Sequence, residues 1–309
     1  MTMSNHAYSV YGLRIHTEMA CPGLPFDPQP DGNPDVTIRM LPPVHAAPGW
    51  LENGYYEVRP GVFRLEIKGV GRYLVEDGSR ISIEPMEGSS ADEVRLFLLG
   101  SVMGALLYQR GLFPLHGSAV ETRWGAMIFV GAQGVGKSTL AAQFYGRGYR
   151  LLSDDVCAVT TRLGMLQVLP ALAQLRLCAD AYERIDSLQK AHFHVDKFVI
   201  PLNESYCPNP VPLKAIHVLA DQEDGDPQFK VLCGFDRVQR LLENLYRPQF
   251  LQGQETQSDL MRLAGQIAQK ASIVTVSRKR DPETIDGLID FLESAWAKHF
   301  GPNPVEEKS

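Results

Sequence analysis

The sequence lacks the patterns that usually identify membrane, secreted and nucleic-acid-binding proteins. Its longest apolar run covers 13 residues, 96–108, whereas a helix needs about 20 to cross a bilayer. It has no long basic block and a formal net charge of −6, so it offers no electrostatic footprint for nucleic acid. The first 16 residues lack the apolar core of a secretory signal. We therefore expect a cytoplasmic protein that binds neither a membrane nor nucleic acid.

The cysteines are few and scattered. No two of the five are spaced as a CxxC or similar ligand pair, which argues against a zinc site and against a disulfide framework. We expect them to be reduced thiols in the core and in loops.

The first 93 residues predict a β-rich N-terminal domain. Short alternating segments are separated by turn-forming stretches rich in proline and glycine, a pattern typical of strands. The expected strands are Val36–Met40, Tyr55–Val58, Val62–Ile67, Tyr73–Glu76 and Ile81–Ile83. No catalytic constellation is visible in this part.

Residues 94–300 predict an α/β domain, and residues 301–309 a disordered tail. A buried helix over residues 92–110 comes first, with Gly100 and Gly104 allowing close packing. Alternating strands and helices follow. The expected strands are Ala126–Val130, Arg150–Val159 with an interruption near Asp154, Ala215–Ala220, Phe229–Cys233 and Ile273–Val276. The expected helices are Ser138–Tyr145, Asp236–Asn244, Ser258–Lys270 and a last one that starts at Asp281-Pro282.

The strongest motif is a phosphate-binding P-loop. Residues 131–138 read GAQGVGKS and fit GxxxxGK[ST] at every fixed position, between an expected strand and an expected helix. The glycines let backbone N–H groups turn toward phosphate oxygens, and the helix adds its positive N-terminal end. Lys137 would contact the β- and γ-phosphates, and Ser138 would be a ligand of Mg²⁺. The predicted nucleotide-binding residues are Gly131, Ala132, Gln133, Gly134, Val135, Gly136, Lys137, Ser138 and Thr139.

Three further residues are candidates for the chemistry. Asp154 and Asp155 are adjacent at the end of an expected strand, where one carboxylate can hold Mg²⁺ and the other can accept a proton from an attacking hydroxyl. His116 precedes the P-loop strand. The residues alone leave other interpretations open: the aspartates can cap a turn, and the histidine can be a packing residue.

These residues together resemble the catalytic core of HPr kinase/phosphorylase. His116-Gly117 precedes the P-loop by 15 residues (131 − 116), and Asp155 follows Lys137 by 18 (155 − 137). The segment RGYRLLSDD is similar to the RGHRLVADD of that family. The close match covers about residues 115–159.

The resemblance implies a P-loop fold related to phosphoenolpyruvate carboxykinase, with ATP and Mg²⁺ as cofactors. It implies that Asp155 is the proton acceptor, that Lys137 and His116 belong to the catalytic site, and that Asp154 supports the metal or Asp155. It also implies an oligomer of identical chains. Two features depart from the family: its glycine-rich segment, with a magnesium-binding Glu and the phosphorylase function, has no clear counterpart, and the N-terminal part is different.

A softer resemblance covers most of the chain. Segments such as YSVYGLRI, YLVEDGSRISIEP and KFVIPL are similar to HPr kinase-like proteins found beside peptide-modification genes, some of which phosphorylate the C-terminal serine of lasso-peptide precursors. Within it, Arg176, Lys197 and Arg247 are candidate contacts to a phosphate or a peptide carboxylate; surface charge or a structural salt bridge is the alternative.

The leading hypothesis is thus an ATP-dependent kinase that phosphorylates serine in a peptide or protein. Three alternatives stay open: a small-molecule kinase, a nucleotide-gated sensor or scaffold without phosphotransfer, and a DNA- or transport-linked ATPase. A sensor needs a carboxylate for Mg²⁺ but no base. The assignment of Asp154 and Asp155 can also be exchanged, because neighbours on a strand face opposite sides.

Overall fold

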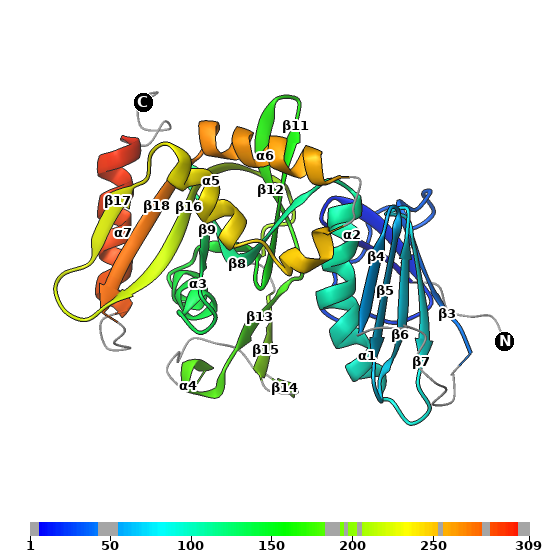
Figure 1. Cartoon of the computed structure of the whole chain (residues 1–309). Coiled ribbons are helices and arrows are strands. Elements are labelled where there is room, and N and C mark those ends of the chain that lie inside the picture. Colours follow the sequence, from blue (N-terminus) through cyan, green and yellow to red (C-terminus); the bar gives the residue numbers. More distant parts are fainter. Residues whose placement is uncertain are drawn as a thin grey trace. The chain divides into compact units, whose positions relative to one another are not determined.

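The computed structural model describes residues 6–42, 55–182, 192–194, 197–202, 206–252, 256–279 and 285–301. The chain forms two compact units (Figure 1), each described here by itself. The first contains Met1–Pro114 and Tyr246–Leu263, and the second contains Leu115–Leu245 and Ala264–Ser309. The predicted helix start at Asp281-Pro282 and, apart from Gly301, the predicted tail lie outside the described residues.

The first unit contains a seven-stranded sheet in the order β1-β2-β3-β7-β6-β5-β4. Its strands are β1 (His6–Val10), β2 (Leu13–Thr17), β3 (Val36–Met40), β4 (Tyr56–Arg59), β5 (Val62–Ile67), β6 (Gly71–Glu76) and β7 (Arg80–Pro85). Alternate residues such as Phe63, Tyr73 and Ile83 are fully buried, so one face of the sheet is covered, as the period of two requires. The β-rich character expected of this segment is confirmed.

A helical segment packs on this sheet. It consists of α1 (Ala91–Phe97), a π-helical turn η1 (Leu98–Val102) and α2 (Met103–Gln109). Ser90 and Glu93 form a capping box at its start. The Tyr73 hydroxyl donates to the Val94 carbonyl at 3.0 Å, and the Gln109 side chain accepts from the Gly78 N–H at 2.8 Å. These bonds join the helix to the sheet, so the first unit extends to residue 114 rather than to the expected boundary at 93.

Residues 246–251 return to the first unit. A Cβ on Gly104 would lie 2.8 Å from the Tyr246 ring, so this glycine permits the close packing expected from the sequence. The Tyr108 hydroxyl donates to the Tyr246 carbonyl at 2.8 Å. Phe250, in η2 (Pro248–Leu251), packs on Phe63 with ring centroids 4.6 Å apart. The sequence pattern carries no signal for this return, because it depends on pairs from 138 (246 − 108) to 187 (250 − 63) positions apart.

The second unit is built on a larger mixed sheet. This sheet has eight strands: seven follow the order β10-β8-β11-β12-β16-β18-β17, and the eighth, β9, pairs with β16 and β8. These strands are β8 (Phe113–Thr122), β9 (Gly125–Gly131), β10 (Arg150–Ser153), β11 (Val156–Arg162), β12 (Met165–Leu169), β16 (Val211–Gln222), β17 (Gln228–Val231) and β18 (Ser272–Lys279). A small sheet contains β13 (Gln174–Leu177), β15 (Lys197–Pro201) and β14 (His192–His194). The α/β class is confirmed; the specific P-loop kinase arrangement stays a prediction.

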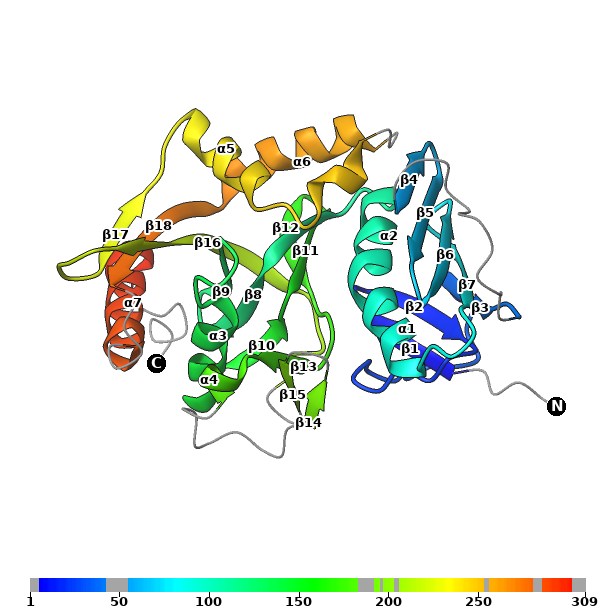
Figure 2. The same cartoon turned by 60° about the horizontal axis from the view of Figure 1, so that its bottom comes forward.

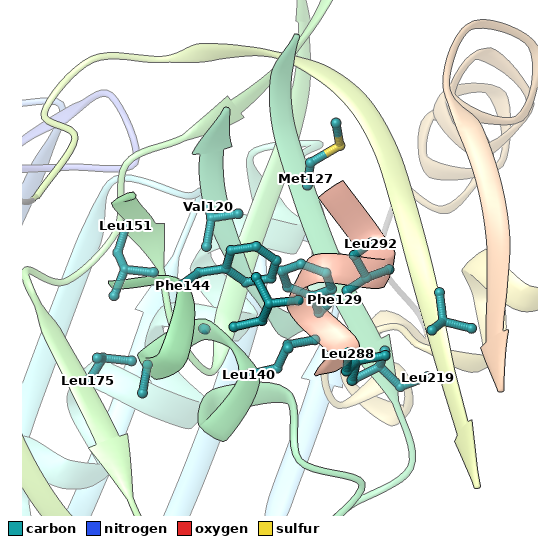
Figure 3. Packing of buried hydrophobic residues seen from close by; sticks show 14 of the residues in the cluster. Val120, Met127, Phe129, Leu140, Phe144, Leu151, Leu175, Leu219, Leu288 and Leu292 are labelled. Carbon is teal, nitrogen blue, oxygen red and sulfur yellow. The ribbon is translucent and has the colours of Figure 1, made fainter. Parts of the chain in front are cut away.

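Helices α3 (Lys137–Gly146) and α7 (Ile285–Phe300) cover the core of this unit. The rings of Phe129, Phe144 and Trp296 meet there, 5.4 to 6.4 Å apart, and Figure 3 shows Phe129 and Phe144 side by side. His217 is fully buried and accepts the Trp296 indole N–H at 2.8 Å. The described residues also form α4 (Ala179–Tyr182), α5 (Phe235–Glu243) and α6 (Gln257–Lys270). Of these three helices, only α6 has its residues divided between the two units. Among the described residues, no helix has the length and apolarity to cross a membrane.

Three parallel strands position the candidate site. β16 pairs in parallel with β9 on one side and with β18 on the other, and Figure 2 shows the three together. Leu219 is the partner of Gly131, and Asp221 is the partner of Arg278. The carboxyl ends of these strands therefore meet at one edge, the usual place for a ligand in an α/β sheet.

Candidate functional site

The P-loop occupies the turn between β9 and α3, as the sequence predicts. Gly131 has φ 143°, and a Cβ at this position would lie 2.7 Å from the Leu219 carbonyl oxygen. Only glycine fits so close to the neighbouring strand. Gly136, with φ 94°, begins α3 without a side-chain cap in the described part of the chain. The first N–H groups of α3 are thus not occupied by a capping side chain, which favours an anion there.

Lys137 lies at the base of this loop. Its side chain is largely buried, and Nζ donates to the carbonyls of Gly131 at 2.9 Å and of Ala132 at 3.0 Å. A buried ammonium group needs such partners. The bonds hold the positive charge inside the curl of the loop, next to Ser138 in the first turn of α3. A phosphate held by the loop would lie next to this positive charge.

The two aspartates lie in the turn between β10 and β11 and have different surroundings. Asp154 is buried, and each of its carboxylate oxygens accepts a hydrogen bond: Oδ1 from the Ser118 hydroxyl at 2.7 Å, Oδ2 from the Arg176 backbone N–H at 2.9 Å. Asp155 has φ 75°, in the left-handed region, and its side chain is 25% exposed. The buried carboxylate thus ties the turn to strands β8 and β13, and the more exposed one can reach a substrate.

His116, on β8, lies against Asp155. Its Nδ1 is 3.1 Å from the Asp155 carbonyl oxygen and 3.4 Å from Oδ1, and the Gly117 N–H donates to the same carbonyl at 3.2 Å. Burial lowers the pKa of His116, and the charge of Lys137 lowers it further, against the opposite effect of Asp155. The imidazole is therefore neutral at pH 7. The ring thus contacts both the backbone and the carboxylate of Asp155, and the charge of Lys137 acts on the same ring.

The donor set at this place suits magnesium. Mg²⁺ prefers hard oxygen ligands and usually needs one or two carboxylates, with waters and phosphates completing its shell. Ser138 and Asp155 offer a hydroxyl and a partly exposed carboxylate, whereas both oxygens of Asp154 already accept hydrogen bonds. The described residues contain no group of three or more His, Cys, Asp and Glu that could hold a metal by itself. A magnesium ion brought by a nucleotide fits this set.

The candidate substrate contacts lie on different elements of the fold. Arg176 lies on β13 and reaches Asp154 through its backbone N–H. Lys197 lies on β15, in the same small sheet. Arg247 belongs to the first unit, where its guanidinium lies over the rings of Tyr246 and Phe250 at 5.7 and 5.8 Å. This packing favours the structural alternative for Arg247.

The sequence analysis missed two residues of the site. Ser118, fully buried on β8, is the donor to Asp154; its place two residues after His116 on a strand was a usable signal, because such residues share a face. Arg278, on β18, donates through Nη2 to the Val135 carbonyl of the P-loop. Residue spacing gives no signal for Arg278, since its approach depends on the pairing of β16 with both β9 and β18.

Comparisons with known proteins find a distant likeness among solved structures. No protein-family model matches the chain, and no curated protein matches it. Among solved structures, the HPr(Ser) kinase/phosphatase from Coxiella burnetii is similar over 61% of this chain and 99% of its own, with 11% sequence identity and a TM-score of 0.36. A likeness at this level does not identify a reaction, so the interpretation depends on the geometry of the site itself.

Proposed function

We propose that the protein is a kinase that transfers the terminal phosphoryl group of ATP to a serine hydroxyl of a peptide or protein. The observation that carries the proposal is the placement of a partly exposed carboxylate, Asp155, against His116, whose pKa the charge of the P-loop lysine also lowers. A nucleotide sensor needs the loop and a magnesium ligand. It has no use for a second, exposed carboxylate that a neutral imidazole holds in place.

The residues divide the reaction as follows. The loop N–H groups, the start of α3 and Lys137 hold the phosphates and neutralise the charge that develops on the transferred group. Asp155 accepts the proton of the serine hydroxyl. The serine oxygen forms a bond to the γ-phosphorus as the bond from that phosphorus to ADP breaks. His116 keeps the turn of Asp155 in place. Magnesium, when held by Ser138 together with phosphate oxygens and waters, would supply further positive charge to the phosphates.

Asp154 acts indirectly in this scheme. Because both of its oxygens accept hydrogen bonds inside the protein, it supports the metal site and Asp155 by holding the turn. The exchanged assignment, with Asp154 as the base, is disfavoured since a buried and doubly hydrogen-bonded carboxylate cannot readily approach a peptide hydroxyl.

The acceptor that we propose is the C-terminal serine of a peptide, such as a lasso-peptide precursor. Its support is the sequence resemblance to HPr kinase-like proteins beside peptide-modification genes, on segments such as YSVYGLRI and KFVIPL. An assembly of identical chains is proposed on the same ground.

Single-turnover transfer from radiolabelled ATP tests the proposal. The acceptors are peptides that end in serine, with the same peptides ending in alanine as blanks. A positioned base contributes about 10²–10⁴-fold, so Asp155→Asn should lose transfer by that factor and keep ATP affinity within about threefold, because the carboxylate acts on the acceptor. Asp224→Asn, at an exposed position between β16 and β17, is the matched control. If Asp155→Asn transfers as fast as the wild type to every acceptor, the kinase mechanism fails and the sensor becomes the better explanation.

A further inference from the structure

Arg278 makes a contact with the P-loop that the scheme above does not use. The residue lies near the end of β18, and its side chain is only 13% exposed. Its guanidinium passes the end of β16 and donates through Nη2 to the carbonyl oxygen of Val135. A Cβ placed on Gly136 would lie 3.0 Å from the same nitrogen. The guanidinium thus lies directly against the last two residues before Lys137.

The chain also holds Arg278 from the other side. Asp221 is the register partner of Arg278 across the parallel pair β16–β18, and its Oδ1 lies 3.6 Å from Nη1. The planar guanidinium offers donors in a fixed fork, so one end can face Asp221 while the other faces the loop. Three neighbouring elements, β16, β18 and the P-loop, are therefore connected through one side chain.

The contact has a consequence for the inside of the loop. In a trans peptide, the C=O and the following N–H point in opposite directions. The Val135 carbonyl is turned outward to Arg278, so the Gly136 N–H is turned to the opposite side, where the P-loop pattern places the phosphates. A cation at the carbonyl end also polarises this peptide group and strengthens its N–H as a donor.

We propose that Arg278 is a positioning residue for the phosphate-binding loop: it fixes the Val135–Gly136 peptide with its N–H toward the nucleotide phosphates. The inference deepens the proposed function and rests on it only for the identity of the ligand, a nucleoside di- or triphosphate. Arg278 does not touch the transferred group in this assignment. Loss of the side chain should weaken ATP and ADP by the same factor, because loop N–H groups hold the phosphates that both nucleotides share.

Calorimetry with Mg-ATP and Mg-ADP tests the inference on three variants. Arg278→Met removes both the charge and the donor. A hydrogen bond from a charged group corresponds to about 10- to 100-fold in affinity, and we expect this variant to lose nucleotide affinity by that factor. Arg278→Lys keeps a charged donor without the fork and should recover part of that loss. Lys279→Met, an exposed neighbour on the same strand, should bind both nucleotides like the wild type.

The outcomes separate this inference from the proposed function. The expected result is an equal loss for ATP and ADP in Arg278→Met, partial rescue by lysine, and a thermal midpoint without nucleotide within a few degrees of the wild type. Unchanged ADP affinity, or a lower midpoint with unchanged affinity, would overturn the positioning role, and so would a wild type that binds neither nucleotide. A selective loss for ATP, with lower turnover at saturation, would instead place Arg278 on the transferred group. A wild type that binds ATP and never phosphorylates serine refutes the kinase proposal and leaves the role of Arg278 intact.

Discussion

Substitution of Asp154 tests whether this carboxylate is a buried structural hydrogen-bond acceptor or a magnesium ligand. The carboxylate faces two donors, the Ser118 hydroxyl and the Arg176 N–H. Asp154→Ala leaves both without their acceptor. A hydrogen bond to a charged group contributes about 1.5–3 kcal/mol, so two such bonds together contribute at least about 3 kcal/mol. We therefore expect Asp154→Ala to lower the free energy of unfolding by about 3–5 kcal/mol.

Asp154→Asn should be far milder, and the reason is geometric. The Arg176 N–H can only donate, so the amide oxygen must face it. The amide NH₂ then faces Ser118, whose hydroxyl can rotate and accept. Both bonds survive without the charge, and a loss of about 1–2 kcal/mol is expected. In Ser118→Ala the same Asn substitution should change stability by a different amount, since the two residues are in contact.

Urea unfolding followed by tryptophan fluorescence measures these differences, because Trp124 and Trp296 both belong to the second unit. A magnesium titration of phosphoryl transfer accompanies it. If Asp154 has a structural role, its variants should have a lower urea midpoint than the wild type and a magnesium requirement close to that of the wild type. If Asp154→Asn instead leaves the midpoint unchanged and raises the magnesium requirement tenfold or more, Asp154 is a metal ligand and the argument from its hydrogen bonds is wrong.

Three further predictions concern the loop and the core. Lys137→Ala should weaken Mg-ATP at least tenfold in calorimetry, because it removes a charge held in the loop; unchanged affinity would remove the P-loop from the mechanism. Gly131→Ala should lower stability by about 2–3 kcal/mol and abolish nucleotide binding, since its Cβ would meet a backbone oxygen, whereas Gly265→Ala, with nothing near its Cβ, should be neutral or stabilising in the same melts. Burial lowers the pKa of His217 from 6.5 to about 3, so the unfolded chain binds one more proton than the folded chain between these pH values, and stability should fall as pH drops from about 6.5 toward 3. In urea titrations at several pH values, His217→Phe should flatten this dependence of stability on pH. An unchanged slope would mean that His217 is not the responsible group.

Local signals in the sequence predict much of this structure. The glycines and Lys137 locate the P-loop turn, and the Asp154-Asp155 pair marks the turn between β10 and β11, because both signals lie within a few residues. The helix expected over residues 92–110 is present, with the π-helical turn η1 at its centre. Periodicity gives no indication of that turn.

The remaining features depend on contacts between distant segments. The pairing of β8 with β10, which brings Ser118 to Asp154, cannot be read from either strand alone. The return of residues 246–263 to the first unit and the approach of Arg278 to the loop are of the same kind. The sequence likewise contains no information that both oxygens of Asp154 accept hydrogen bonds, so the division of roles between the aspartates required the structure.

The parallel pairing of β9 with β16 has a consequence for how the chain acquires its site. Ile128 and Ile216 are register partners separated by 88 positions (216 − 128), and the strand that carries Arg278 comes later still. Long-range parallel pairs form slowly, because a long loop must close before any contact compensates for its entropy. During synthesis, the whole P-loop motif leaves the ribosome well before the strand that supports it. A nascent chain that already contains every residue of the motif is therefore still without a phosphate cradle, and nucleotide can stabilise the protein only in the last stage of its folding.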